Sequence, residues 1–122
     1  MRFYQFLLQI CLSFILLNCS TNNSPVNDEI NVQILNSEVY EYKTGISGDE
    51  EGASIKKQAQ HFEISDIFRN SETGWEAVYR YKPESNFIGF DYVELEIKTG
   101  SDGASPSSKI ELIKITIEVV GT

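Results

Sequence analysis

Two runs of alternating apolar and charged residues lie on either side of a short turn in the second half of the chain. The apolar positions are Trp75, Ala77, Tyr79 and Tyr81 in the first run and Val93, Leu95 and Ile97 in the second. Side chains of a strand point alternately to its two faces, so each run predicts a strand with one buried face. The two strands are expected to be antiparallel neighbours or to face each other across a core.

Pro83 and Gly89 shape the turn between these two runs. Proline lacks the backbone donor that a strand ladder needs, so Pro83 is expected to end the first strand. Gly89 permits backbone angles that would be costly for Phe87 or Ile88. The connection is therefore expected to have a defined conformation.

Four further segments extend the predicted β pattern. Alternation predicts a strand over 30–34, and 39–43 forms a second short strand or continues the first. The segment 55–65 begins with the propensity of a helical turn, but the alternation that follows favours a strand. In the last run, 109–120, the apolar phase changes after Leu112, which predicts a β-bulge.

Length and charge limit the classes of protein to consider. The chain has 122 residues, enough for one folded domain, and a formal charge of −8. Removing everything before Cys19 takes away Arg2 and no acidic residue, so the charge of −8 becomes −9. An acidic surface repels phosphate groups, which argues against a nucleic-acid partner. Both cysteines precede residue 20, so a chain that begins at Cys19 has no second thiol for an internal disulfide.

The first seventeen residues form a short, mainly apolar run with Arg2 near its start, which is the layout of a secretory leader. The run ends in Leu16, Leu17, Asn18 and Cys19. This ending resembles the lipobox of bacterial lipoproteins. The resemblance implies a lipoprotein signal peptide at 1–18, cleavage before Cys19, and attachment of diacylglycerol and a further acyl chain such as palmitate to that residue. An ordinary signal peptide or an N-terminal membrane anchor is the alternative.

The lipobox resemblance also predicts how the rest of the chain is organised. Residues 19–28 are small, polar and turn-forming, so they are expected to be a flexible tether between lipidated Cys19 and a domain over 29–122. Two or more acyl chains hold a protein stably on a bilayer. The expected location is the bacterial cell envelope, with Ser20 after the cysteine compatible by resemblance with the outer membrane.

Two groups of residues are candidates for chemistry at a site. Asp49, Glu50 and Glu51 lie between glycines, and clustered carboxylates are ligands that Ca²⁺ prefers. The ligand spacing of a recognised calcium loop is missing, which favours a solvated turn without a metal. His61 is the single histidine and falls on the polar face of its predicted strand, where an ordinary surface role is favoured over that of a catalytic base. No cofactor is predicted.

A set of residues in the last third of the chain carries a second resemblance. The set comprises Tyr81, Pro83, Asn86, Phe87, Gly89 and Asp91, followed by an alternating strand, a glycine-rich loop and a β-branched final run. This order resembles bacterial Ig-like and cadherin-like repeat domains. The resemblance implies an all-β, Ig-like Greek-key β-sandwich of about seven strands. It also implies structural roles for the set, with Phe87 closing one end of the sandwich and Asp91 fixing a corner.

These observations favour a membrane-anchored, non-catalytic module that serves binding, adhesion or a structural role and contacts a protein or glycan in the envelope. A second hypothesis is an accessory subunit of an envelope complex, which an exposed contiguous patch of Phe68, Tyr40 and Tyr42 would favour. A third is a glycan hydrolase that uses Glu94 and Glu96, although glutamates on one face of an alternating strand are usually solvated. No catalytic constellation is recognisable, so the chain is not expected to be an enzyme.

Overall fold

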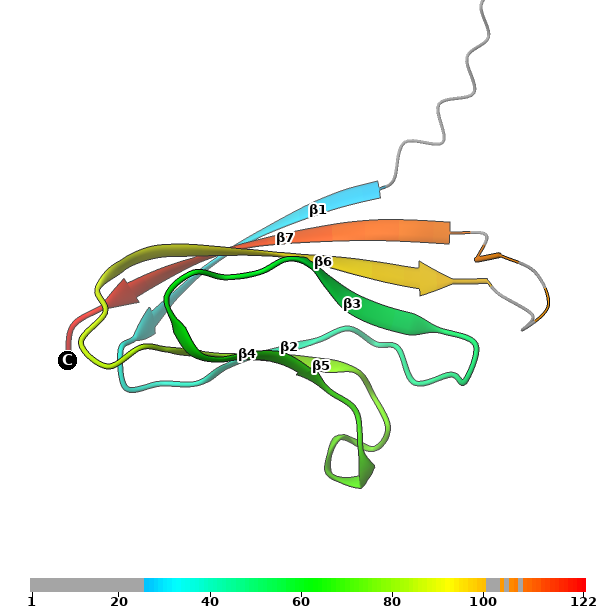
Figure 1. Ribbon diagram of the computed structural model, residues 1–122, viewed down its shortest axis with the longest axis horizontal. Coiled ribbons are helices and arrows are strands. Elements are labelled where there is room, and N and C mark those ends of the chain that lie inside the picture. The colour runs from blue at the N-terminus through cyan, green and yellow to red at the C-terminus, as the bar shows by residue number, and fades with distance from the viewer. Residues whose placement is uncertain (1–25, 101–103, 105, 108) are drawn as a thin grey trace, which may run out of the picture.

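The computed structural model describes residues 26–100, 104, 106, 107 and 109–122, and strands are nearly all of the regular secondary structure in this part of the chain (Figure 1). The strands are β1 (Val26–Leu35), β2 (Tyr40–Lys43), β3 (Gly52–Lys57), β4 (Phe62–Phe68), β5 (Val78–Pro83), β6 (Gly89–Thr99) and β7 (Lys109–Val120), and a 3₁₀ turn, η1, spans Ser71–Thr73. The predicted signal peptide, lipidated Cys19 and most of the tether lie outside the described residues.

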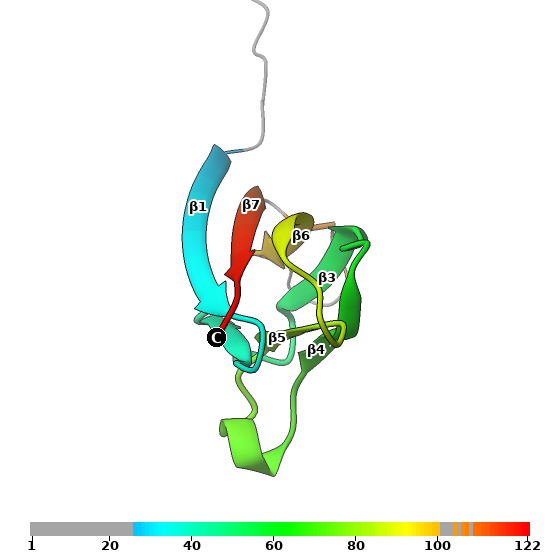
Figure 2. The ribbon, with the colours of Figure 1, turned by 90° about the vertical axis from the view of Figure 1, so that its left-hand side faces the viewer.

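The seven strands form two sheets that face each other (Figures 1 and 2). One sheet has the order β1-β7-β6-β3 and the other has the order β2-β5-β4. The rows β2-β5-β4 and β7-β6-β3 correspond to strands B-E-D and G-F-C of an immunoglobulin domain. The prediction of an all-β, Ig-like Greek-key sandwich of about seven strands is therefore confirmed.

The first strand lies parallel to the last one, at the edge of the four-stranded sheet. Val26 is opposite Glu111 and Leu35 is opposite Val120, so β1 accompanies β7 over ten residues. β6 and β7 are joined as an antiparallel hairpin with a continuous register from Gly89–Val119 to Thr99–Lys109. This arrangement brings residues of the N-terminal and C-terminal segments side by side on the outer face of one sheet.

Alternating apolar residues of the two sheets fill the space between them. Tyr79, Tyr81, Leu95, Ile115 and Ile117 are among the most deeply buried side chains. The two central runs belong to different sheets, since β5 lies in one and β6 in the other. Of the two predicted arrangements, the structure has the one in which these strands face each other across the core.

Trp75 is not part of the first run. β5 begins at Val78, and Trp75 is 61% exposed with a left-handed φ of 65°. The chain turns sharply here because Gly74 also has a positive φ and the Trp75 amide donates to the Asn70 carbonyl at 2.8 Å. The prediction that Trp75 points into the core is therefore wrong.

The predicted bulge after Leu112 is also wrong. β7 pairs with β1 and with β6 without a register shift. Leu112 and Ile113 are both buried although they lie on opposite faces of the strand, so an apolar residue on the outer face produced the apparent change of phase. Register shifts occur instead in β3 between Ile55 and Lys57 and in β4 between Phe62 and Ile64.

The structure moves one predicted boundary and decides between the two alternatives for 39–43. β1 begins at Val26, three residues before the predicted start of the domain at Glu29, so the last part of the predicted tether is strand. The second strand is separate, because a turn follows Leu35 and β2 lies in the other sheet. Within the described ranges, no helix is long and apolar enough to cross a membrane.

Candidate functional site

The outer face of β6 carries two exposed aromatic side chains near the start of the strand. Phe90 is 57% exposed and Tyr92 is 55% exposed, whereas Asp91 and Val93 between and after them are buried. Residues two apart on a strand point to the same face, so both rings stand on the outside of the four-stranded sheet. Large apolar side chains gathered at one place on a surface indicate a contact site more often than scattered ones do.

A groove of about 340 Å³ runs across this face beside Tyr92. Its lining side chains come from all four strands of the sheet: Glu29, Asn31, Lys57, Tyr92, Glu94, Lys114 and Thr116. Tyr92 is opposite Thr116 in the ladder, and Thr116 is opposite Asn31, so an aromatic ring, a hydroxyl and an amide form one row across three strands. The groove thus combines an apolar wall with hydrogen-bonding groups, which is the composition of small-ligand sites.

A second row beside the first carries charges of both signs. Glu94 is opposite Lys114, and Lys114 is opposite Glu29. Lys57 is opposite Glu94 on its other side. The lining therefore contains two carboxylates and two ammonium groups, so its formal charge is balanced although the whole chain carries −8.

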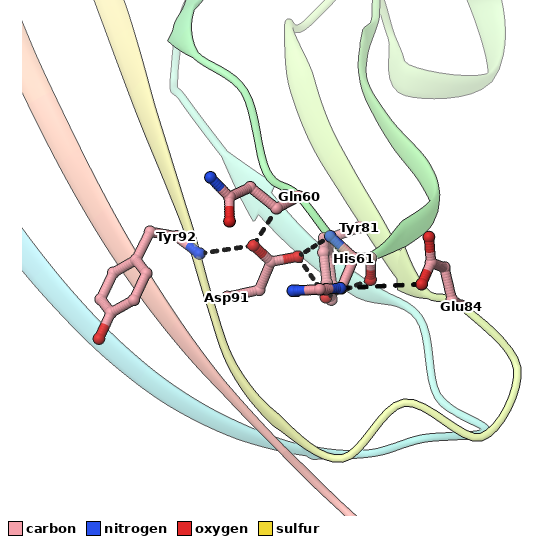
Figure 3. Close-up of polar contacts among 6 residues, drawn as sticks. All are labelled: Gln60, His61, Tyr81, Glu84, Asp91 and Tyr92. Carbon is pink, nitrogen blue, oxygen red and sulfur yellow. Dashed lines mark hydrogen bonds and ion pairs between the residues drawn. The ribbon is translucent and has the colours of Figure 1, made fainter.

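Asp91 fixes the backbone from which the Tyr92 ring projects (Figure 3). Its side chain is 2% exposed and points into the sandwich. One carboxylate oxygen accepts from the Tyr92 and Gln60 amides at 2.9 Å each, and the other accepts from the His61 amide at 2.8 Å and the Tyr81 hydroxyl at 3.0 Å. These bonds join β6 to the loop before β4 and to β5, so Asp91 ties the two sheets together at this end.

The other residues of the Ig-like and cadherin-like set surround Asp91. Tyr81 and Pro83 are buried, and Phe87 packs against the core from the loop before β6. Asn86 and Gly89 both have positive φ, at 66° and 140°, which asparagine and glycine tolerate better than most residues. Tyr81, Pro83 and Phe87 thus pack at the same end of the sandwich as Asp91.

His61 stacks on the ring of Phe87, with 4.4 Å between ring centroids and an interplanar angle of 10°. Its Nδ1 lies 3.8 Å from a carboxylate oxygen of Glu84, which is exposed (Figure 3). Neither neighbour is a nucleophile of the kind that a histidine base activates. The contacts of His61 therefore serve the packing at this end of the sandwich.

Tyr79 and Tyr81, the two tyrosines of β5, are buried, and the pKa of each is raised. Burial raises the pKa of Tyr79 from its usual value of 10.0 to about 12, although a hydrogen bond with Ser65 acts in the opposite direction. Burial and the neighbouring Asp91 carboxylate raise the pKa of Tyr81 still further. At pH values above 10, these groups remain neutral in the folded protein while tyrosines of the unfolded chain ionise.

We expect the free energy of unfolding to fall as pH rises from about 10 through about 12, since the raised pKa values stabilise the fold fully only below the unfolded-state value. Each tyrosine contributes a slope of up to about 1.4 kcal/mol per pH unit. Urea titrations between pH 8 and 12 would measure this loss. Tyr79→Phe should show a shallower decline, and a decline parallel to the wild type would contradict the assignment.

Glu94 and Glu96 lie on the same outer face of β6, and each has a lysine close by. Lys56 Nζ is 3.9 Å from the Glu94 carboxylate, and Lys98 Nζ is 2.9 Å from the Glu96 carboxylate. Glu94 lines the groove beside Tyr92, whereas Glu96 does not. The structure thus brings one of the two glutamates into the candidate site.

Side chains hold the acidic loop through hydrogen bonds to its backbone. The Glu51 carboxylate accepts from the Gly48 amide at 3.3 Å, and Asp49 and Glu50 are exposed. The guanidinium of Arg69 donates to the carbonyl oxygens of Gly48 and Glu51 at 2.6 and 3.0 Å. Among the residues that the structure describes, no three His, Cys, Asp or Glu side chains are grouped so that they could hold a metal ion.

The patch expected from Phe68, Tyr40 and Tyr42 is not exposed. Tyr40 and Tyr42 are partly buried and pack against the core. Phe68 is partly buried, and the guanidinium carbon of Arg80 lies 4.9 Å from its ring centroid. The exposed patch of these three side chains that would favour an accessory subunit is therefore not found.

A second groove, of about 460 Å³, lies between the edge strands β3 and β4. It is lined mainly by small and aliphatic residues, including Ala53, Ile55 and Ile67. Its one cationic side chain, Arg69, already donates to three backbone carbonyls. This groove offers fewer polar groups for a ligand than the face that carries Tyr92.

The aromatic face was missed from the sequence although its signal is present. The alternation that places Val93, Leu95 and Ile97 inside continues backwards through Asp91. Extending it by two steps places Tyr92 and Phe90 outside, beside the charged positions. In most strands the apolar residues point inward and the charged residues point outward. An inward aspartate between two outward aromatic residues is the reverse, and this reversal would have marked the site.

No protein-family model matches the chain, and no curated protein matches it. Among solved structures, the chain is similar to an endo-fucoidan hydrolase from glycoside hydrolase family 107, with 13% identity and a TM-score of 0.48 over 77% of this chain and 13% of that chain. It is similar to a 2,6-sialyltransferase of Vibrionaceae Photobacterium sp., with 13% identity and a TM-score of 0.44 over 81% of this chain and 19% of that chain.

The chain is also similar to a cysteine protease inhibitor from Entamoeba histolytica, with 10% identity and a TM-score of 0.40 over 78% of this chain and 98% of that chain. It spans only 13% and 19% of the length of the two enzymes. At these identities and scores, the likenesses carry no statement about the activity of this chain.

Proposed function

We propose that this protein is a lipid-anchored component of the bacterial cell envelope whose Ig-like domain is a non-catalytic binding module. The observation that carries the binding role is the exposed pair Phe90 and Tyr92 beside a groove on the four-stranded sheet. The anchor is supported by the apolar leader that ends at Cys19. A domain with one such face, held near a bilayer, is suited to retain an envelope component at the membrane surface.

The contacts around the other candidates support a module more than an enzyme. His61 is stacked on Phe87, and Glu96 is paired with Lys98. Asp91 accepts four hydrogen bonds that hold two sheets together, so its oxygens are already used. In contrast, the groups that line the Tyr92 groove face outward.

The anchor and the binding face are tested together with the full chain. When it is expressed in a bacterium that processes lipoproteins, we expect radiolabelled palmitate to enter the wild type and Cys11→Ser but not Cys19→Ser. The wild-type chain, immobilised from detergent, should retain solubilised envelope material that Tyr92→Ala does not retain. Trp75→Ala is the matched control for binding, because Trp75 is equally exposed but lies outside the groove.

Two results would contradict the proposal. Equal labelling of Cys19→Ser and the wild type would exclude Cys19 as the lipidated residue. Equal retention of envelope material by the wild type and Tyr92→Ala would exclude the outer face of the sheet as the binding surface.

A further inference from the structure

We propose that the groove beside Tyr92 binds a neutral oligosaccharide, with Phe90 and Tyr92 as the platform on which sugar rings stack. This inference rests on the proposed binding function and names the chemical class of its ligand. It follows from three features of the groove: the two rings, the hydrogen-bonding row and the charge balance.

The two aromatic side chains are matched to a ligand with apolar faces. A pyranose ring presents C–H groups on its faces and hydroxyl groups around its rim. Stacking such a face on an exposed aromatic ring removes apolar surface of both from water. Phe90 and Tyr92 are two positions apart on one strand, about 7 Å along it, so neighbouring sugar units of one chain can meet one ring each.

The row beside Tyr92 supplies partners for the hydroxyl rim. Thr116 lies opposite Tyr92 on the antiparallel pair β6–β7, where such side chains are about 5 Å apart, and Asn31 follows Thr116 on β1, which runs parallel to β7. A hydroxyl and an amide each donate and accept hydrogen bonds, as sugar hydroxyl groups do. The groove volume of about 340 Å³ is at the lower end of the range for small-ligand sites, which suits a short oligosaccharide segment.

The charges of the lining favour a neutral ligand over a polyanion. Glu29 and Glu94 balance Lys57 and Lys114, so the groove offers no net positive charge. The rest of the chain is acidic, with a formal charge of −8 overall. A polyanionic glycan would therefore be repelled by the whole protein without compensation in the groove.

The surroundings of the two rings also favour a glycan over a protein. The outward residues opposite Phe90 on β7 and beyond it on β1 are Glu118 and Gln33, which hydrogen-bond to each other at 3.1 Å. Polar side chains thus border the two rings on this side, and the exposed Ile88 lies two positions before Phe90. This short apolar row is narrower than the centre of a stable protein interface, which usually buries about 800 Å² on each partner.

The test is isothermal titration calorimetry of the full chain in a detergent whose head group is not a sugar, because a glucoside or maltoside would compete for the groove. The probes are cellohexaose, xylohexaose, laminarihexaose and mannohexaose, with alginate as the polyanion. We expect at least one neutral hexaose to bind the wild type. Tyr92→Ala should weaken that binding by about tenfold, Tyr92→Phe by less than about threefold, and Trp75→Ala not measurably.

Each opposite outcome overturns the inference. The first is the absence of binding to all four neutral hexaoses at a probe concentration of about 10 mM, at which even a millimolar affinity would be detected. The second is binding of alginate alone, and the third is equal binding by the wild type and Tyr92→Ala. If Tyr92→Ala loses the retention of envelope material while no hexaose binds, the glycan inference fails and the proposed binding function stands. If Tyr92→Ala retains envelope material as the wild type does, the proposed function fails independently of the hexaose result.

Discussion

Replacement of Asp91 by alanine is expected to lower the free energy of unfolding by about 3–5 kcal/mol, because three buried amides at the end of the sandwich lose their acceptor. These are the amides of Gln60, His61 and Tyr92, whereas the Tyr81 hydroxyl keeps the His61 carbonyl as an acceptor at 3.0 Å. An unpaired buried donor costs about 1–3 kcal/mol, and water entering the site would satisfy some of them. Domains of this size have only about 5–15 kcal/mol of stability, so this one change removes a large share.

Chemical denaturation monitored by circular dichroism measures this loss. Asp49→Ala is the matched control, because that carboxylate is exposed and its removal should change stability by less than about 0.5 kcal/mol. Asp91→Asn keeps the size of the side chain but turns a donor toward donors, so it should also destabilise the fold. A loss below about 1 kcal/mol for Asp91→Ala would show that the corner is not held by this carboxylate.

Replacement of Arg69 by alanine is expected to cost about 2–4 kcal/mol. Its guanidinium donates to the carbonyl oxygens of Gly48, Glu51 and Trp75 at 2.6, 3.0 and 2.8 Å. One side chain thus holds the loop before β3 against the turn that precedes β5. Hydrogen bonds from a charged donor are stronger than neutral ones, and three of them depend on this residue.

Arg69→Lys tests whether geometry or charge matters at this position. An ammonium group cannot reproduce the planar fork that meets three carbonyls in different directions, so the lysine variant should recover less than half of the loss. Lys98→Ala is the control, since its pairing with Glu96 lies at the surface and such pairs contribute about 0–1 kcal/mol. Full stability of Arg69→Lys in urea would show that only the charge is needed.

The fold could be predicted because most strands alternate regularly between a buried and an outer face. Val93, Leu95 and Ile97 are inside, as their spacing indicates. The prediction failed at Trp75, because Trp75 and Gly74 before it both have a positive φ, and the alternation of a strand cannot continue through them. Whether a tryptophan continues a strand or begins a turn depends on contacts such as that of its carbonyl with Arg69, and these are set by the folded chain.

Only part of the candidate site could be predicted. The face of β6 that carries Phe90 and Tyr92 follows from alternation within one strand. The groove does not, because it needs the parallel pairing of β1 with β7, whose paired residues are more than eighty positions apart in sequence. Asn31 and Thr116 have no local feature that distinguishes them from other polar strand residues, so only the register reveals them as neighbours of Tyr92.

With the proposed anchor at Cys19, the entry of β1 into its sheet limits how far the domain could move from a bilayer. Val26 lies opposite Glu111, at the end of the sandwich that also carries the start of β3, whereas Phe90 lies toward the opposite end (Figure 1). An extended chain covers at most about 3.6 Å per residue, so the segment from an anchored Cys19 to Val26 reaches about 25 Å. A tether of this length would keep the acidic loop on the side of the domain nearest the lipid. Phe90 and Tyr92 would face away from the bilayer and reach only ligands close to the membrane.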